Sequence, residues 1–482
     1  MAKFNETKSI KTVNNCGHVA YSMTDKAKLV TQVLTSFFNE SKFYGDNSAE
    51  IEETIARVIK KEPEFISKLA IFARREFNMR SIAHVLTVYL AHETEGKPYV
   101  RQTVKGISLR GDDVTEIMAF YLSKFGKPIP NSLKKGINDV LIKFDEYTFA
   151  KYKGNGKAVK MRDLLCLCRP TPISESQSQM WKRCLENKLE TPVTWETQLS
   201  ANGNNAETWE KLIDSGKVGY MALLRNLANI VKANPNNIDK VLERIQNPEA
   251  VRKSKQLPFR YLSAYLTVQP IANSKVLDAL ENAVDIAVEN LPKISGTTVI
   301  AIDVSGSMRN PVSSKSNVLC CDIALMLGYI ANRICENAYV YAFNNSAQQI
   351  TTPKRSGIIE SVINKRKMCG GGTNMSSPFI KMISDNIQAD RVIILSDNEC
   401  NSFRWPWYDR GATVNKLANE YRNKTGNNIW VHAIDLQGYG TQQFAGERTN
   451  IIAGWSEKVF DFINLAEQGE GTLEKTISEY IW

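Results

Sequence analysis

Apolar residues recur at three- and four-residue spacing through most of the first 290 positions, as in helices that bury one face. The segments that show this pattern most clearly are 49–62, 64–77, 80–93, 221–234, 259–269 and 276–291. Short polar breaks separate them, as between antiparallel helix pairs. The pattern predicts helix after helix over residues 25–292, in an irregular HEAT-like solenoid without a strict repeat.

The pattern changes near Pro292. A β-branched apolar run begins after this residue and ends in Asp, Ser and Gly at 303–308. The elements expected after this first strand are a helix at 318–335, strands at 338–343 and 391–397, a helix at 412–424, strands at 429–436 and 458–464, and a terminal helix at 471–482. Apolar strands that alternate with helices predict a doubly wound parallel sheet. We therefore expect two domains, residues 1–294 and 295–482.

The composition fits a soluble protein, with 43% apolar and 23% charged residues among 482. No run of eighteen apolar residues predicts a membrane span, and the polar N-terminus lacks the apolar core of a secretory signal. Nine cysteines without a CxxC pair, and only four histidines, argue against a structural zinc site. We expect free thiols in a reducing, cytoplasmic location.

Oxygen-bearing residues gather where the strands of the expected sheet end. Asp303, Ser305 and Ser307 directly follow the first strand, Thr373 stands in a glycine-rich loop, and Asp397 closes the strand 391–397. Ligands of open α/β sheets bind at the carboxyl ends of the strands. Carboxylates and hydroxyls are hard donors, so Mg²⁺ is the ion we expect, with Mn²⁺ and Ca²⁺ as alternatives.

This set resembles the metal-ion-dependent adhesion site of von Willebrand A domains, with DxSxS at 303–307. The resemblance implies that Ser305, Ser307 and Thr373 coordinate the ion directly, and that both aspartates do so directly or through water. It also implies an open coordination position for an acidic group of a partner. Two other interpretations stay open: a site that is structural or vacant, and a Ser/Gly loop that only caps a helix.

Catalytic interpretations of the same residues are weaker. Asp303 and Asp397 could act as paired carboxylates in acid–base catalysis, but the hydroxyls around them and the lack of a nearby histidine favour metal binding. The loop CGGGTN lacks the Lys-Ser/Thr of a phosphate-binding loop. A two-metal nuclease needs more clustered acidic ligands. We therefore expect a protein that is not an enzyme.

The net charge of +10 is confined to one part of the chain. Residues 296–482 hold 18 basic and 18 acidic side chains, so 43 basic and 33 acidic side chains belong to residues 1–295. The densest basic stretch, residues 97–162, carries 14 basic and 6 acidic side chains, and Tyr147 and Tyr152 interleave with its lysines. Amines and aromatic rings together suit phosphate neutralisation and base stacking. The alternative is a solvated basic surface without a partner.

Three segments of the helical part, residues 14–34, 151–170 and 221–227, resemble the TROVE module of the Ro autoantigen family and its bacterial relatives. That family joins TROVE to a C-terminal von Willebrand A domain, the order found here, and the resemblance covers roughly residues 10–480. It implies a ring of HEAT-like helical repeats closed by the A domain. It further implies small noncoding Y RNA on an outer basic surface and single-stranded 3′ ends of misfolded RNA in a central hole. The implied role is RNA quality control or a ribonucleoprotein scaffold.

The resemblance also implies that residues 151–169 contact Y RNA, through positions that match Lys151, Lys157 and Arg169. Arg169 stands where relatives tend to carry histidine. With the basic residues around them, the expected RNA-binding set is Lys134, Lys135, Lys151, Lys153, Lys157, Lys160, Arg162 and Arg169. We expect a monomer without membrane contacts, whose protein partner is an exoribonuclease or another protein with an acidic residue. The alternative function is a metal-dependent protein-interaction module for which RNA binding is incidental.

Overall fold

The computed structural model describes residues 11–13, 19–35, 49–154, 156–190, 192–289, 291–312, 316–353, 357–399, 414–437, 441–444, 448–454, 457–467 and 473–481. The chain divides into two compact units, one of Met1–Thr24 with Gln198–Leu473 and one of Asp25–Thr197 with Glu474–Trp482. This division groups residues by compactness and does not test the domain boundary expected between residues 294 and 295. That boundary stays a prediction. The expected terminal helix and the segment 14–34 lie partly outside the described residues.

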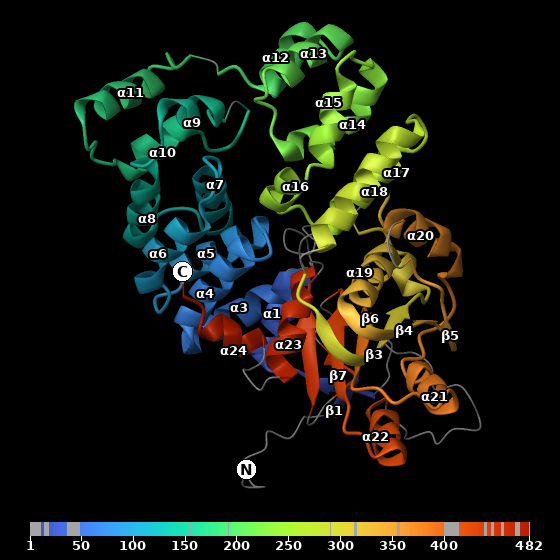
Figure 1. Cartoon of the computed structure of the whole chain (residues 1–482). Coiled ribbons are helices and arrows are strands. Elements are labelled where there is room, and N and C mark those ends of the chain that lie inside the picture. The colour runs from blue at the N-terminus through green and yellow to red at the C-terminus, as the bar shows by residue number, and fades with distance from the viewer. Residues whose placement is uncertain are drawn as a thin grey trace. The chain divides into compact units, whose positions relative to one another are not determined.

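The unit of Asp25–Thr197 is helical, as its apolar periodicity predicts (Figure 1). Its helices are α1 (Asp25–Thr35), α3 (Ala49–Lys61), α4 (Pro63–Arg75), α5 (Ser81–His92), α6 (Lys97–Ile107), α7 (Asp113–Phe125), α8 (Asn131–Leu141), α9 (Glu146–Lys151), α10 (Met161–Cys168) and α11 (Glu175–Leu185). Proline stands in the first turn of α4 and α6, where its missing N–H costs no helical hydrogen bond.

The C-terminal segment packs on α4 within this helical unit. The hydroxyl of Tyr480 donates to Glu76 at 2.8 Å, and the Tyr480 ring meets Phe72 edge to face at 5.2 Å. The Lys68 ammonium donates to the carbonyl of Ser478. The short helix α24 (Leu473–Ser478) precedes these contacts, at the division between the units.

The other unit begins with further helices and then forms the sheet. After α12 (Trp195–Asn202), which spans the division, come α13 (Ala206–Asp214), α14 (Tyr220–Ala233), α15 (Ile238–Ile245), α16 (Pro248–Ser254), α17 (Pro258–Val268) and α18 (Ser274–Glu289). The helices expected at 221–234, 259–269 and 276–291 are confirmed. None of the helices that the structure describes has the length and apolar character to cross a bilayer.

The six-stranded sheet runs in the order β5-β4-β3-β6-β7-β9 and is parallel except for β5. Its strands are β3 (Ile294–Asp303), β4 (Cys335–Phe343), β5 (Ala347–Gln349), β6 (Arg391–Ser396), β7 (Trp430–Asp435) and β9 (Thr449–Ala453). A separate small sheet joins β1 (Lys11–Val13), β2 (Val19–Ser22) and β8 (Thr441–Gln442). The doubly wound parallel architecture expected from the sequence is confirmed.

One strand prediction is wrong. Residues 458–464 form η5 (Glu457–Phe460) and the start of α23 (Asp461–Glu467), and the last parallel strand is β9. Phe460, Ile463 and Ala466 are buried at helical spacing, which the short apolar alternation in the sequence obscured.

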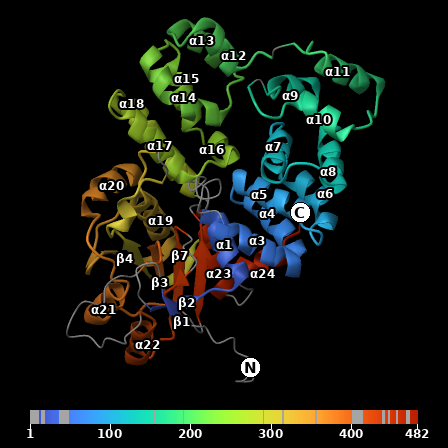
Figure 2. The ribbon, with the colours of Figure 1, turned by 180° about the vertical axis from the view of Figure 1, so that it is seen from behind.

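Helices cover both faces of the sheet. Alternate residues such as Val299 and Ala301 share one buried cluster with α21 (Ser377–Ser384) and α22 (Val414–Thr425). On the opposite face of β3, Ile302 meets Gly328 of α19 (Cys320–Ile334), where a larger residue would clash. The helix α20 (Ile358–Lys365) lies beside α19, as the view from behind also shows (Figure 2). This layering leaves the carboxyl ends of the strands free to carry loops.

Candidate metal site and basic surface

Two buried aspartates lie side by side at the carboxyl edge of the sheet. Because Ile302 of β3 pairs with Leu395 of β6, Asp303 and Ser396 are the next residues on neighbouring strands. The Ser396 hydroxyl donates to Asp303 at 2.6 Å, and Asp397 follows directly. Asp303 is 0% and Asp397 1% exposed, so both carboxylates are withdrawn from bulk water.

The loop after β3 folds its hydroxyls back onto these carboxylates. The Ser305 N–H donates to Asp303 at 2.8 Å, and the hydroxyls of Ser305 and Ser307 lie 3.2 Å apart. A hydrogen bond from Ser307 helps to stabilise the charged form of Asp397. Four of the five expected metal ligands therefore form one hydrogen-bonded group.

The fifth ligand, Thr373, is buried in a loop that is attached to the first. The Gly306 N–H donates to Gly371 at 2.9 Å, and the Gly370 N–H donates to Val304 at 2.8 Å. A Cβ on Gly306 would lie 3.0 Å from the Gly371 carbonyl oxygen, so this approach favours glycine. The loops that carry all five residues thus meet at one edge.

Asn344 and Asn345, directly after β4, fix the glycine-rich loop. The Asn344 amide donates to Gly370 at 2.9 Å, and Asn345 accepts from Gly372 at 2.9 Å. Neither asparagine was expected from the sequence, nor was Ser396, which orients Asp303. Ser396 is the last residue of β6, and the two asparagines follow β4 at the edge where ligands bind. That position is the signal that could have identified them.

The charges of this group are not balanced within the described part of the chain. Burial raises the pKa of Asp303, and the nearby charge of Asp397 raises it further; burial also raises the pKa of Asp397. No described cationic side chain forms an ion pair with either carboxylate. The described residues contain no group of three His, Cys, Asp or Glu side chains suited to a metal, so a metal here would rely on hydroxyls. Two facing carboxylates with hydroxyls fit a hard divalent cation, which would supply the missing positive charge.

The second candidate site is formed by α9, α10 and the turn between them. Asp145 caps α9 by accepting from Thr148, and Asp163 accepts from the Lys160 N–H at the start of α10. Positive φ angles at Gly154 and Gly156 let the chain reverse between the helices. Figure 2 shows both helices beside α7 and α8 of the same unit.

Lysine and tyrosine side chains come together at the end of α9. The Lys151 ammonium lies 5.6 Å from the ring centroids of both Tyr147 and Tyr152, and Arg110 lies 5.7 Å from that of Tyr152. Tyr147 is half-exposed, so its ring remains accessible. Cations and accessible aromatic rings therefore share this surface.

Other expected RNA-binding residues fall into two groups along α10. Burial raises the pKa of the Cys184 thiol of α11 to about 11, and the nearby charges of Arg162 and Lys153 partly offset the rise. Both cations therefore lie near that thiol, with Arg162 in the first turn of α10. Burial likewise raises the pKa of Cys168 to about 12, offset by Lys134 at the other end. The eight residues of α10 separate these ends by about 12 Å.

The remaining members of the expected set differ in their partners. Lys157 pairs with Glu116 at 3.3 Å. Arg169 ends α10 with a left-handed φ of 50°, and its side chain is exposed, as is that of Lys135 on α8. We call Tyr147, Lys151, Lys153, Lys160 and Arg162 the α9–α10 surface. No acidic side chain among the described residues forms an ion pair with these four cations.

A helical-repeat region and a von Willebrand A-type sheet with hydroxyls and aspartates at its carboxyl edge define a two-part class of protein. The family model described as the TROVE domain matches residues 19–187 and 182–276, and that of the Ro60 vWA domain matches 297–428. The chain belongs to the family of TROVE-domain proteins that carry a Ro60-type von Willebrand A domain.

Several curated relatives match part of this chain. Telomerase protein component 1 of Rattus norvegicus is 27% identical over 49% of this chain and 12% of its own length. RNA-binding protein RO60 of Deinococcus radiodurans is 26% identical over 38% of the chain and 37% of the relative, and that of Caenorhabditis elegans is 27% identical over 41% and 32%. The chain thus matches well under two thirds of these relatives.

The crystal structure of the Deinococcus radiodurans RO (RSR) protein has a similar fold. The TM-score is 0.63, and the match covers 93% of this chain and all of that one. The sequence identity is 16%, so this likeness concerns the fold alone.

Proposed function

We propose that this chain is a noncatalytic RNA-binding protein of the cytoplasm that acts in RNA quality control or as a ribonucleoprotein scaffold. It binds a small noncoding Y-type RNA on the basic surface of its helical region. It takes single-stranded 3′ ends of structured or misfolded RNA into a central hole of the ring that the family resemblance implies. The observation that carries this proposal is the α9–α10 surface, with its four cations that no described acidic side chain neutralises.

The chemistry of that surface supports RNA over a protein partner. Phosphate contacts by lysine and arginine release counterions and supply most of the affinity for a polyanion. An exposed ring beside the cations, as at Tyr147, offers a platform for an unpaired base. The deep groove of A-form RNA is closed to side chains, so recognition rests on shape and backbone rather than on sequence.

The group around Asp303 and Asp397 supports a second part of the proposal, a divalent-metal site with Ser305, Ser307 and Thr373. Mg²⁺ is the ion proposed, with Mn²⁺ or Ca²⁺ as alternatives. When bound, the ion supplies a coordination position that an acidic side chain of a partner can fill. An exoribonuclease, or another protein with an accessible carboxylate, is the partner class that fits.

Salt-dependent binding tests the RNA proposal. The affinity for a small structured RNA should fall steeply with salt, and Lys151→Glu with Lys153→Glu should reduce the slope by about 2, because each lost phosphate contact removes about 0.9. The matched control, Lys60→Glu with Lys97→Glu, changes the net charge equally on exposed parts of α3 and α6. Weak binding that is independent of salt, or equal effects of the two pairs, would refute the proposed surface.

The second candidate function is a metal-dependent protein-interaction module with incidental RNA binding. The unbalanced pair of buried aspartates is the observation that favours it. Protein capture by the full chain that EDTA abolishes and ribonuclease leaves intact would favour this function. Capture lost on ribonuclease treatment and unaffected by EDTA would exclude it.

A further inference from the structure

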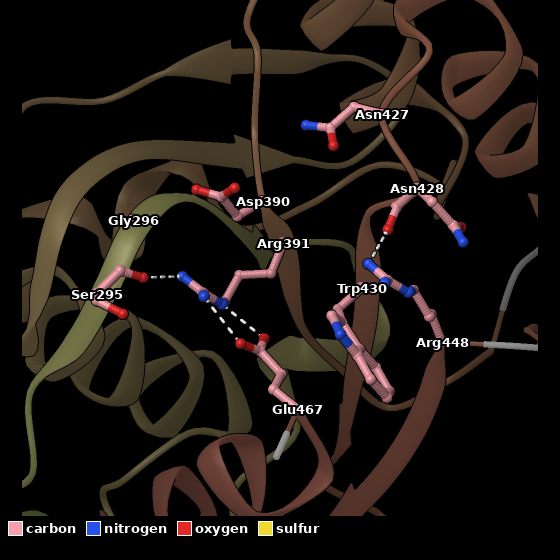
Figure 3. A pocket seen from close by; sticks show the side chains of 9 residues that line it. All are labelled: Ser295, Gly296, Asp390, Arg391, Asn427, Asn428, Trp430, Arg448 and Glu467. Atoms are coloured by element: carbon pink, nitrogen blue, oxygen red, sulfur yellow. Dashed lines mark hydrogen bonds and ion pairs between the residues drawn. The ribbon is translucent and has the colours of Figure 1, made fainter. Parts of the chain in front are cut away.

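A hollow of about 330 Å³ lies at the opposite end of the sheet from the metal site, beside the amino-terminal ends of β3, β6 and β7 (Figure 3). We call it the Arg448 hollow and define it by Asp390, Asn427, Asn428, Trp430 and Arg448. A second hollow of about 470 Å³ shares Asn428 with it. Neither the family resemblance nor the proposed function makes use of these hollows.

Arg448 is held in place and still exposed. Its Nη1 donates to the Asn428 carbonyl at 2.5 Å, and its guanidinium lies 5.8 Å from the Trp430 ring centroid (Figure 3). Its own carbonyl accepts from the Val431 N–H at 2.8 Å, which fixes the backbone. No carboxylate in the described part of the chain pairs with Arg448, so most of its five donors face the hollow or solvent.

Arg391 is the second guanidinium of the hollow, and it is already satisfied. It pairs with both oxygens of Glu467, at 2.6 and 2.8 Å, and donates to the Ser295 carbonyl at 2.5 Å (Figure 3). Arg391 is buried, so it belongs to the floor of the hollow. Arg448 is therefore the side chain that can recognise an anion here.

The remaining groups supply acceptors and an aromatic wall. Asp390 is exposed, and one of its oxygens accepts from the Thr297 N–H at 2.7 Å, which orients the carboxylate. Asn427 donates to the Ala389 carbonyl, which fixes its amide at the edge. Trp430 is partly exposed and stacks on His432 at 5.6 Å, so its ring is held rigidly.

A fixed guanidinium, one carboxylate, amides and an indole within one small hollow match a ligand that carries an anion, hydroxyl or N–H donors, and a planar ring. A ribonucleotide has all three, since phosphate suits arginine and ribose hydroxyls or base N–H groups suit a carboxylate. We propose that the Arg448 hollow binds one ribonucleotide unit, with its phosphate on Arg448 and its hydroxyl or base donors on Asp390.

The unit could be a free nucleotide or part of an RNA strand, and in the latter case the inference rests on the proposed RNA binding. The test uses the full chain, 4-thiouridine monophosphate and a single-stranded oligonucleotide that contains 4-thiouridine. After irradiation, crosslinked peptides are mapped by mass spectrometry. Labelling of the hollow by the monophosphate indicates a free nucleotide, and labelling by the oligonucleotide alone indicates a strand.

Arg448→Gln should lower crosslinking at the hollow about tenfold, as expected for the loss of a charged hydrogen bond. Lys367→Gln, which removes an exposed charge elsewhere on the same unit, should leave it unchanged. Asn428→Ala, which keeps the carbonyl that holds Arg448, is a second variant in case Arg448→Gln unfolds. No crosslink at the hollow with either probe, or an unchanged yield in both variants, overturns the inference. Crosslinks on α9 and α10 report separately on the proposed function.

Discussion

Two buried aspartates of this chain have opposite surroundings. In the helical unit, Asp113 is fully buried and accepts from Arg80 at 2.5 Å and from the Leu109 and Arg110 N–H groups at 2.9 and 2.8 Å. Burial alone would raise the pKa of Asp113, but the hydrogen bond from His84 and the neighbouring arginine charges hold that pKa well below its usual range. Asp303 is equally buried and faces a second carboxylate, and its pKa is raised.

The difference separates a charge that stabilises the fold from a charge that needs a ligand. A buried carboxylate with its own cations is complete, whereas a buried pair without described cations lacks a counter-charge. The exposed cations follow the same division. Arg101 is paired with Asp139 at 2.5 Å, while Lys151 and Lys153 have no such partner among the described residues. The unmatched charges are the ones to which we assign metal and RNA.

Removal of the charge of Asp113, the buried carboxylate that has its own cations, should have the largest effect on stability. Asp113→Asn leaves the buried Arg74 without its anion and Arg80 with Asp112 as its remaining anion. We expect the free energy of unfolding to fall by about 3–5 kcal/mol in urea titrations. Asp112→Asn, at the neighbouring and more exposed carboxylate, should cost less than about 1 kcal/mol. Equal losses in the two variants would show that Asp113 is not the centre of the network.

Removal of the charge of Asp303, a buried carboxylate that no described cation pairs with, should affect metal binding instead. Asp303→Asn should weaken Mn²⁺ binding by at least about 100-fold, because it removes a charged ligand, as titration calorimetry can measure. The metal-free variant should be no less stable than the metal-free parent, since the repulsion with Asp397 is relieved. Asp385→Asn, an exposed aspartate of the same unit, serves as the control. Unchanged Mn²⁺ affinity would contradict the metal site.

A fall in pH should remove the stability that the charge of Asp113 contributes. The folded-state pKa of Asp113 lies below its unfolded value, so this residue contributes stability above the unfolded pKa and loses it as pH falls. Between pH 5 and pH 3, about the unfolded value of 3.9, unfolding free energy should fall more steeply in the parent than in Asp113→Asn. If the unfolding free energies of the parent and of Asp113→Asn fell equally with pH, the lowered folded-state pKa of Asp113 would be contradicted.

The smallest effect is expected at the end of α10. Arg169→Gly should raise the free energy of unfolding by up to about 1 kcal/mol, because glycine adopts the left-handed φ more easily. Arg169→Gly should lower RNA affinity less than the charge reversal of Lys151→Glu with Lys153→Glu. Lys255→Gly, at another left-handed helix end, should give a similar gain in stability without a change in RNA affinity. A larger RNA effect at Arg169 would shift the binding surface toward the C-terminal end of α10.

Much of the fold was predictable because its signals are local. Apolar spacing located the helices of both units, and the run before Asp303 located the first strand of the sheet. The strand-end rule then brought Asp303 and Asp397 together, since parallel strands end at one edge. Thr373 was added from the glycine-rich loop by the resemblance to the metal-ion-dependent adhesion site. The error at 458–464 arose where a short apolar stretch satisfied both helical and strand periodicity.

What the sequence could not reveal depends on contacts between distant positions. Asp113 meets Arg74 across 39 residues, and Asn344 meets Gly370 across 26. The pairing of Lys157 with Glu116 spans 41 residues, and it distinguishes this lysine from its neighbours. No residue pattern shows which cations are already neutralised by a carboxylate. That distinction depends on ion pairs that form only in the folded structure.

We propose that the α9–α10 surface binds small noncoding RNA, and sequencing of the RNA that copurifies with the full chain tests this binding. We predict enrichment of small structured RNA with the parent protein and with Asp303→Asn. The variant with Lys151→Glu and Lys153→Glu should lose this enrichment, while Lys60→Glu with Lys97→Glu should retain it. No RNA above background, or equal enrichment in all four proteins, would contradict RNA binding by the α9–α10 surface.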